Sequence, residues 1–370
     1  MVDTVSFYNY LVNNKLDFFT GVPDSLLKEL CACIKDNSDA KHNIIAANEG
    51  NAVGLASGYY LSTGKLGVVY MQNSGEGNAV NPLLSLADPK VYSIPMLLII
   101  GWRGEPGVHD EPQHVKQGEV TLKLLEAMDI SYRILSDNYE DDLSSLIALA
   151  KKESKPVALV IRKGTFSKYS PVNKEKAVMG ELLREEALEV ILSNIGDDYV
   201  VSTTGKESRE IFEIRERNNE GHAHDFLTVG SMGHTSSIAL GVSIGTNKNV
   251  WCLDGDGSFI MHMGGLAIAG VNAGSNFKYI INNNAAHESV GGQPTVSDQI
   301  DIKAILKACG FINTYEAKTK EEIAKYIEIM KKDGKSALIL YTKQGSRDDL
   351  GRPTTTPIEN KNAFMDEIKK

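Results

Sequence analysis

Residues 250–258 read Val-Trp-Cys-Leu-Asp-Gly-Asp-Gly-Ser, and residues 277–284 read Phe-Lys-Tyr-Ile-Ile-Asn-Asn-Asn. The apolar start of each stretch predicts a buried β-strand, Val250–Leu253 in the first and Lys278–Ile281 in the second. A helical pattern follows the first stretch from Met261. This order of strand, glycine turn and helix is typical of an α/β sheet. The turn also suits a bound phosphate, because glycines let the backbone approach it closely.

The polar side chains after these two strands predict a metal site. Asp256 lies in the turn Gly255–Ser258, and Asn283 follows the second strand. Adjacent parallel strands end at the same edge of a sheet, where the ligands of such folds bind. Because Mg²⁺ accepts a few protein oxygens together with phosphates, we expect Asp256 and Asn283 to share one Mg²⁺. A Gly-Asp-Gly turn by itself also fits an ordinary connection between a strand and a helix.

The rest of the chain alternates short apolar runs with longer helical patterns, which predicts an α/β fold with parallel sheets. The chain has 370 residues, a length that suits two domains. We expect a domain over residues 1–165, a polar linker over 166–180 and a second domain over 181–370, each a mostly parallel sheet flanked by helices. The other expected strands are Ile44–Ala46, Gly67–Met71, Pro95–Ile100, Val157–Ile161, Tyr199–Ser202 and Ala337–Tyr341.

The two halves also echo each other. A small-residue helical pattern over Ala52–Gly58 precedes a strand and the glycine turn Ser74–Gly77. A similar pattern over Ser236–Gly245 precedes a strand and the turn Gly255–Gly257. This echo gives weak support to a duplicated unit.

Composition argues against several classes of function. The net charge of −9 disfavours a nucleic-acid or acidic-membrane surface, and an anionic substrate would need a local cationic pocket. No apolar run approaches the ~20 residues of a membrane span, and the N-terminus lacks the features of a signal peptide. We therefore expect a cytoplasmic protein. The cysteines lack disulfide or metal-ligand spacing and are expected to be buried free thiols: Cys31, Cys33, Cys252 and Cys309.

The two opening stretches together resemble the signature of the thiamine-diphosphate enzymes, which is Gly-Asp-Gly, a helix and strand, then Asn-Asn. The resemblance implies thiamine diphosphate as cofactor, held through Mg²⁺. Asp256 and Asn283 would be the side-chain ligands of the metal, and the backbone carbonyl of Ala285 the third. Many members of the family have glycine at this third position, and alanine fits there if its φ is negative.

The resemblance also assigns residues to the cofactor. Met232, in the sequence Gly230-Ser231-Met232-Gly233, would wedge between the two rings of the cofactor. The Gly230 carbonyl would accept a hydrogen bond from the 4′-amino group. The other expected cofactor-binding residues are Ser231, Gly255, Gly257, Ser258, Gly205 and Lys206, the last two at a strand end that turns into a helix.

Glu49 occupies the position of the family's indispensable carboxylate, after the expected strand Ile44–Ala46. Its carboxylic acid would hydrogen-bond the N1′ nitrogen and favour the imino tautomer, whose nitrogen removes the thiazolium proton. Taken alone, Glu49 also fits an acid at a helix N-terminus. The family places this glutamate and the diphosphate site in different subunits. The resemblance therefore implies a homo-oligomer, at least a dimer, with a pyrimidine-binding first domain and a diphosphate-binding second domain, and without a middle domain.

Runs along the whole chain resemble one branch of the family, the phosphonopyruvate decarboxylases, with the sulfopyruvate decarboxylases as near relatives. The resemblance implies that an anionic 2-keto acid, phosphonopyruvate, is decarboxylated to phosphonoacetaldehyde in phosphonate biosynthesis. Sulfopyruvate enzymes are often split into two chains, so the single chain favours phosphonopyruvate. The runs are Gly21–Ser25, Tyr70–Pro82, Gly101–Gly104, Asp110–His114, Ala286–Thr295 and Gly345–Pro353.

The polar residues of these runs suggest proton carriers. After CO₂ leaves, a carbon must be protonated, and a hydroxyl group must then lose a proton to release the product. Groups that titrate near neutral pH suit these steps, so His114 and His287 are the first candidates, and each is alternatively a hydrogen-bonding loop residue. Asp24 is expected to relay protons with His114.

A phosphonate carries up to two negative charges and is best bound by arginine or lysine. The candidates are Arg103, Lys116, Arg347 and Arg352, and at least one of them is expected to contact the substrate.

The residues leave open two other functions for the protein. One is a carboligase of the acetolactate synthase type, against which the absent middle domain argues. The other is a non-catalytic nucleotide- or phosphate-binding protein.

Overall fold

The computed structural model describes residues 1–172 and 178–370, which form two compact units, Met1–Glu175 and Lys176–Lys370. The expected linker of residues 166–180 begins within the first unit. Phe166 is buried and its backbone pairs with Val2, and Thr4 hydrogen-bonds Ser167. Residues 173–177 of that linker lie outside the described residues.

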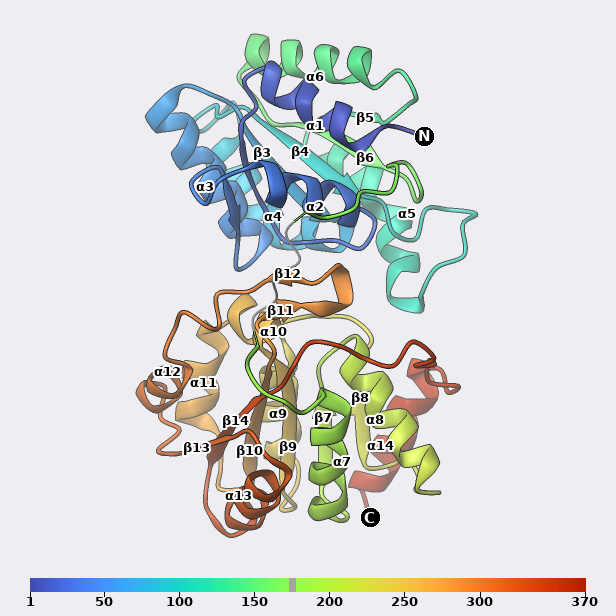
Figure 1. The fold of residues 1–370 in the computed structure, drawn as a ribbon, viewed down its shortest axis with the longest axis vertical. Helices are drawn as coiled ribbons and strands as arrows, with labels where there is room; N and C mark the ends of the chain where they lie inside the picture. Colours follow the sequence, from blue (N-terminus) through green and yellow to red (C-terminus); the bar gives the residue numbers. More distant parts are fainter. Residues whose placement is uncertain (173–177) are drawn as a thin grey trace. The chain divides into compact units, whose positions relative to one another are not determined.

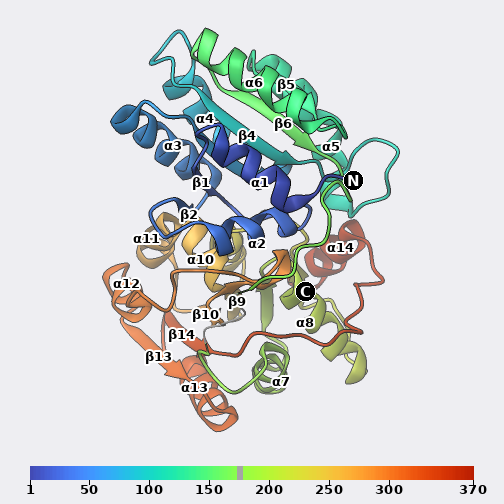
Figure 2. The same ribbon diagram turned by 45° about the horizontal axis from the view of Figure 1, so that its top comes forward.

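The first unit is a parallel six-stranded sheet with helices on both faces (Figure 1). Its strands are β1 (Phe18–Gly21), β2 (Asn43–Ile45), β3 (Gly67–Gln72), β4 (Met96–Gly101), β5 (Ser131–Ile134) and β6 (Val157–Ile161). One face is covered by α1 (Thr4–Asn13), α2 (Lys28–Asn37) and α6 (Tyr139–Glu153), as Figure 2 also shows. The other face is covered by α3 (Glu49–Thr63), α4 (Glu76–Pro82) and α5 (Pro112–Ala127).

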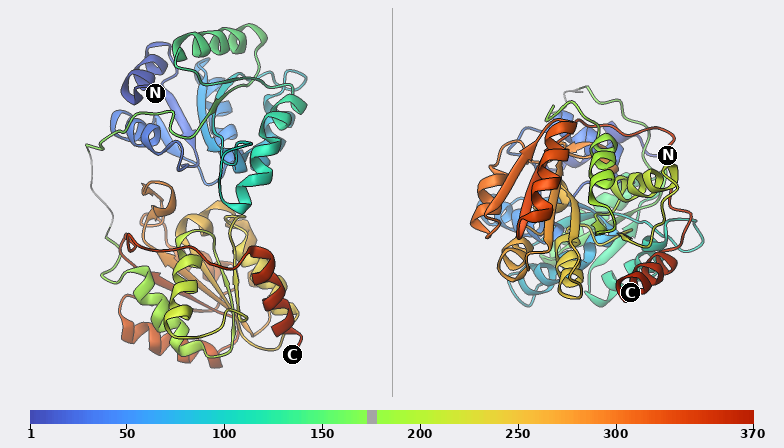
Figure 3. Two further views of the ribbon diagram at one scale, coloured as in Figure 1. Left: turned by 90° about the vertical axis from the view of Figure 1, so that its right-hand side faces the viewer. Right: turned by 90° about the horizontal axis from the view of Figure 1, so that it is seen from below.

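The second unit is also a parallel six-stranded sheet. Its strands are β7 (Tyr199–Ser202), β8 (Asp225–Leu227), β9 (Val250–Gly255), β10 (Phe277–Asn283), β13 (Asn313–Ala317) and β14 (Ser336–Tyr341). One face is covered by α7 (Arg184–Ile195), α8 (Lys206–Arg217) and α13 (Lys320–Lys332). The other is covered by α9 (Thr235–Ile244), α10 (Asp256–Met261), α11 (Gly264–Asn272), α12 (Ile302–Ala308) and α14 (Pro357–Ile368). The last of these, red in Figure 3, packs beside β8.

The two sheets have the same strand order. The first runs β2-β1-β3-β4-β6-β5, and the second runs β8-β7-β9-β10-β14-β13 when it is followed from its β8 edge. Numbered within each unit, both orders are therefore 2-1-3-4-6-5. The similar sequence patterns of the two halves thus correspond to a repeated topology. The glycine turns Ser74–Gly77 and Gly255–Gly257 lie at the ends of equivalent strands, β3 and β9.

The expected strands are all present to within two residues at either end, but four other strands of the two six-stranded sheets were not predicted. Three of these, β5, β8 and β13, lie at sheet edges, where a strand has one neighbour and needs fewer apolar side chains. The fourth, β1, is an interior strand of four residues that ends in Thr20 and Gly21. The helical pattern expected from Met261 corresponds to α11, which begins at Gly264, and the short helix α10 over Asp256–Met261 precedes it.

Burial agrees with the sequence pattern. Residues 96–100 in β4 are almost wholly inaccessible, as expected for a strand covered on both faces. All four cysteines are free thiols, and Cys31, Cys33 and Cys252 are buried while Cys309 is partly exposed. No helix among the described residues is long and apolar enough to cross a bilayer.

Candidate active site

The carboxyl edge of the second sheet brings Asp256 and Asn283 together. β9 and β10 are adjacent and parallel, with Gly255 opposite Asn282. The Ser297 hydroxyl lies 2.9 Å from Asp256 Oδ2 and 2.7 Å from Asn283 Oδ1, so the two oxygens are neighbours. Thr295 donates a second hydrogen bond to Asp256 Oδ2. Neither Thr295 nor Ser297 was among the predicted site residues, although Thr295 ends one of the runs.

This pair of oxygens has the chemistry of a magnesium site. Burial raises the pKa of Asp256 to about 6, and the hydrogen bonds from Thr295 and Ser297 only partly oppose the shift. The Asn283 amide nitrogen is buried without a partner among the described residues. A buried carboxylate is stabilised by a cation, and carboxylate and amide oxygens are ligands that Mg²⁺ prefers.

Ala285 corrects one expectation. Its φ is +55°, whereas alanine was expected here with a negative φ. The left-handed conformation is unfavourable for a residue with a Cβ, which explains why glycine suits this position. Ala285 is held in it by hydrogen bonds from its own N–H to Asn283 Oδ1 at 3.1 Å and from the Thr295 N–H to its carbonyl at 3.1 Å.

Met232 and His287 meet at Gly257. A Cβ built on Gly257 would stand 2.8 Å from His287 Nδ1 and 3.4 Å from Met232 Cε. Any larger residue at position 257 would therefore displace the histidine ring. The turn that carries Met232 has positive φ at Ser231 and Gly233, and the Gly233 N–H donates to Ser258 Oγ at 3.0 Å. Burial lowers the pKa of His287 to about 4, so its ring is neutral at physiological pH.

Gly205 and Lys206 begin α8 beside the segment that follows His287. Gly205 has a φ of +97°, and a Cβ there would lie 2.8 Å from Ser289 Oγ. The Lys206 ammonium donates to Glu288 at 3.1 Å and to Ser346 at 2.7 Å. Its charge is therefore already paired, and its predicted contact with the diphosphate stays a prediction.

In the first unit, Glu49 is the first residue of α3 and is buried. Asn78 of α4 donates to its carboxylate at 2.8 Å. Gly75 packs so closely that a Cβ there would stand 2.2 Å from Glu49 Oε1. Burial raises the pKa of Glu49, with the Asn78 hydrogen bond opposing the shift, and this favours the protonated acid.

Three other residues of interest meet at the carboxyl edge of the first sheet. Asp110 accepts hydrogen bonds from both the Nε and Nη2 atoms of Arg103, and His114 Nδ1 lies 3.0 Å from Asp110 Oδ1. The Gly104 N–H and the Glu111 N–H donate to the same carboxylate. Burial would raise the pKa of Asp110, but the bonds from Arg103 and His114 hold it well below its usual range. Asp110 was not predicted as a site residue, although it begins the run that ends at His114.

Asp24 lies close enough to this group for its pKa to be affected by the Arg103 charge. Its side chain is fully buried against Gly101, and burial raises its pKa to about 6 although the Arg103 charge opposes the shift. The recorded hydrogen-bond partner of His114 is Asp110, so a direct relay between Asp24 and His114 stays a prediction.

The remaining predicted cations differ in their surroundings. Lys116 is mostly exposed and pairs with Glu119 on the same helix. Arg347 is shared by three carboxylates, those of Glu185, Glu213 and Asp349. Arg352 is exposed five residues further along the chain.

The chain matches two family models, the thiamine pyrophosphate enzyme N-terminal TPP binding domain over residues 5–125 and the C-terminal TPP binding domain over residues 203–340. It is 34% identical over 361 residues to a phosphonopyruvate decarboxylase of Streptomyces viridochromogenes, which covers 92% of this chain and 88% of the relative. It is 33% identical over 368 residues to another from Streptomyces hygroscopicus, with coverages of 94% and 89%. A sulfopyruvate decarboxylase of Methanosarcina acetivorans is 29% identical over 331 residues, with coverages of 83% and 82%. The chain therefore belongs to the thiamine pyrophosphate enzymes, in the family that includes the phosphonopyruvate decarboxylases.

Proposed function

We propose that this enzyme decarboxylates phosphonopyruvate to phosphonoacetaldehyde and CO₂, with thiamine diphosphate and Mg²⁺, in phosphonate biosynthesis. The observation that carries the proposal is similarity to phosphonopyruvate decarboxylases along nearly the whole chain, including both sheet edges described above. Sulfopyruvate is the second candidate substrate, because a single-chain sulfopyruvate decarboxylase also matches most of the chain.

The residues of the second sheet edge fit the cofactor. Asp256, Asn283 and the Ala285 carbonyl would hold Mg²⁺, and the Gly255–Ser258 turn would meet the diphosphate. Met232 and the Gly230 carbonyl would meet the rings, with Gly257 and His287 beside the Met232 side chain. The bound cofactor supplies a carbon nucleophile and an electron sink for the pair of electrons left by CO₂.

Glu49 would donate a hydrogen bond to the pyrimidine of the cofactor, since its burial favours the protonated acid. Asn78 holds one oxygen of the carboxyl group and Gly75 closes one side of it. These contacts fix the direction of the acid before the cofactor binds, so little reorganisation is needed.

The pKa values of the three candidate proton carriers, His114, His287 and Asp24, are all shifted by burial. Burial lowers the pKa of His287 and that of His114, so the neutral imidazole is favoured in both; with a pKa of about 4, His287 is a weak base that is better suited to hydrogen bonding than to taking up a proton. Burial raises the pKa of Asp24 to about 6, which brings this acid close enough to neutral pH to exchange a proton. Of the four predicted cations we favour Arg103 for the phosphonate. Its Nη1 atom reaches only Ser25 Oγ, at 2.7 Å, among the recorded hydrogen bonds of the described chain.

The activity is tested by measuring CO₂ release from phosphonopyruvate, sulfopyruvate and pyruvate side by side, with cofactor and Mg²⁺ present. We expect the fastest turnover with phosphonopyruvate. Faster release of CO₂ from sulfopyruvate would identify the enzyme as a sulfopyruvate decarboxylase. Acetoin or acetolactate from pyruvate without phosphonate turnover would identify a carboligase.

Replacing Asp110 by asparagine should lower kcat by about 10²-fold, because His114 and Arg103 would both lose the carboxylate that orients them. Burial lowers the pKa of His114, the hydrogen bond that His114 donates to Asp110 raises it, and the Arg103 charge that Asp110 balances lowers it. Removing the carboxylate therefore lowers the pKa of His114 further. The acid limb of the pH–rate profile should move to lower pH in D110N, whereas loss of activity with an unchanged profile would contradict this role.

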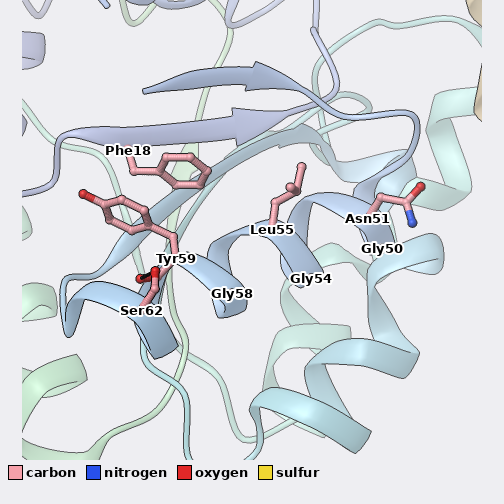
Figure 4. Close-up of a pocket in the computed structure, with 8 residues that line it drawn as sticks. All are labelled: Phe18, Gly50, Asn51, Gly54, Leu55, Gly58, Tyr59 and Ser62. Carbon is pink, nitrogen blue, oxygen red and sulfur yellow. Dashed lines mark hydrogen bonds between the residues drawn. The ribbon is translucent and has the colours of Figure 1, made fainter. Parts of the chain in front are cut away.

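We also propose that the enzyme is a homo-oligomer whose active sites combine Glu49 of one copy with the diphosphate site of another. A cavity of about 660 Å³ lies along α3, lined by Gly50, Gly54 and Gly58 on one side of the helix and by Phe18 and Tyr59 at one end (Figure 4). Glycines spaced four residues apart expose the helix backbone, which allows close approach of another helix. The groove begins one residue after Glu49 and therefore suits a helix of a second copy.

Replacing Gly54 by leucine should dissociate this oligomer without unfolding the chain. Gly54 is exposed, and no atom lies within 4 Å of a Cβ built there, so the larger side chain fits the isolated unit. Sedimentation velocity should show a shift to monomer with an unchanged circular dichroism spectrum. If the G54L variant keeps the mass of the wild-type oligomer, α3 is not at the interface.

A further inference from the structure

Glu288 follows His287 directly and lies at the centre of a buried ionic group in the second unit. Its carboxylate accepts hydrogen bonds from Arg184 Nη1 at 3.1 Å, Lys206 Nζ at 3.1 Å and Asn284 Nδ2 at 2.9 Å. Arg184 also forms a two-pronged pair with Glu210, with distances of 2.7 and 2.8 Å. We call Arg184, Lys206, Glu210, Asn284 and Glu288 the Glu288 clamp.

The clamp contains charged side chains that are buried, and the fold of the second unit does not need such charges at these positions. The side chain of Glu210 is fully inaccessible, and those of Arg184 and Glu288 are 8% and 11% exposed. Two cations and two carboxylates balance each other, but removing such charges from water costs several kcal/mol per ion before pairing offsets it. Apolar side chains of similar size would stabilise the unit at least as well. A role in fixing a geometry is therefore a better account of the clamp than a role in stability.

The segment that the clamp holds is a small hairpin over the site. β11 (Ala286–His287) pairs antiparallel with β12 (Gln293–Pro294), and the one-turn helix Glu288–Val290 connects them with Gly291 and Gly292. Both glycines have positive φ, +111° and +71°, so the turn has little conformational restraint of its own. The hairpin nevertheless has to keep the His287 ring above Gly257, where the ring lies in close contact.

We propose that Glu288 is a positioning residue, which through Arg184, Lys206 and Asn284 fixes the hairpin so that His287 stands beside the bound cofactor. This inference rests on the proposed function for the role of His287. Arg184 begins α7 and Lys206 begins α8, so the carboxylate ties the hairpin to the first residues of two helices packed on the sheet.

Lys206 extends the clamp to the segment after β14. Its ammonium donates to Ser346 Oγ at 2.7 Å, and the Gln344 side chain donates to the Asn284 carbonyl at 3.3 Å. The hairpin is thus held from α8 on one side and from the Gln344–Ser346 segment on the other. Loss of the Glu288 charge would loosen the connections to Arg184 and Lys206, since a neutral amide cannot satisfy two cations.

Hydrogen–deuterium exchange in the Glu288→Gln variant, without cofactor, tests the clamp directly. The Gly292 and Thr295 N–H groups are protected by bonds to the carbonyls of His287 and Ala285. We expect peptides that span residues 284–297 to exchange at least about 10-fold faster than in the wild type, while exchange in the strands of the sheet is unchanged.

With phosphonopyruvate as substrate, the kcat of the Glu288→Gln variant should fall by about 10²-fold and its KM should change little, because His287 would be misplaced. Glu288→Asp, which keeps the charge, should recover part of both effects.

The matched control is Glu328→Gln, which removes the carboxylate of the Lys331–Glu328 pair on the surface of α13. It should alter neither exchange in the hairpin nor kcat. Unchanged exchange in the Glu288→Gln hairpin would overturn the inference, and so would faster exchange throughout the second unit, which would mark a purely structural role. If the wild-type enzyme releases no CO₂ from phosphonopyruvate, the proposed function fails, while the exchange measurement still decides whether Glu288 fixes the hairpin.

Discussion

Replacing Glu49 by glutamine should lower CO₂ release from phosphonopyruvate by about 10³-fold and leave the fold intact. Glutamine keeps the size of the side chain and can still bond Asn78, so the packing against Gly75 is preserved. It has no acidic proton, however, and cannot favour the imino form of the cofactor's pyrimidine. Steady-state kinetics and a thermal melt of the same preparation separate the two effects.

Glu153→Gln is a suitable control, because Glu153 is an exposed acid at the end of α6 that pairs with Lys155. It should leave kcat unchanged. Wild-type turnover in the Glu49→Gln variant would show that the buried acid of α3 takes no part in the chemistry. That result would favour a non-catalytic binding protein.

Replacing Asp256 by alanine should weaken Mg²⁺-dependent binding of thiamine diphosphate by at least about 100-fold. Changes to residues that merely orient metal ligands cost 10–100-fold in affinity, and loss of a charged ligand should cost at least as much. Thr295, Ser297 and Asn283 would remain, but they offer the metal no negative charge. Isothermal titration calorimetry with and without Mg²⁺ measures the effect.

Two variants complete this experiment. Asp256→Asn keeps the shape of the buried side chain and should bind as weakly as the alanine variant, which identifies the charge as the cause. Asp298→Ala removes an exposed acid from the segment that also carries Ser297, and it should bind like the wild type. Undiminished affinity in Asp256→Ala would remove the basis for a metal at this edge of the sheet.

The parts of the site that follow from chain order were predictable. A strand in a parallel sheet ends at the carboxyl edge, so Asp256 after β9 and Asn283 at the end of β10 had to approach each other once the strands were neighbours. The repeated glycine turns likewise corresponded to equivalent strands of two sheets with one topology. The edge strands β5, β8 and β13 were missed because their side chains are only partly buried and carry a weak apolar pattern.

The electrostatic partners were not predictable in the same way. Arg347 pairs with Glu185 and Glu213, which lie 162 and 134 positions away in the sequence, and Glu288 meets Arg184 across 104 positions. A charged residue in a sequence does not indicate whether its charge is already balanced. Asp110, which orients both Arg103 and His114, was overlooked although it lies only four residues before the histidine.

The sequence by itself determined the fold class, the cofactor and the two sheet edges that bear its expected ligands, beginning with residues 250–284. The fold class and the meeting of the two strand ends depend on local apolar patterns and on the order of strands, whereas the cofactor follows from the resemblance of these stretches to the family signature. Only the tertiary structure decided that Ala285 adopts a left-handed backbone, that Lys206 is paired with Glu288, and that His287 stands over Gly257. Those features depend on contacts between segments far apart in the chain. Whether the cost of burying a charged group is offset by a partner depends on which segments come together in the folded structure.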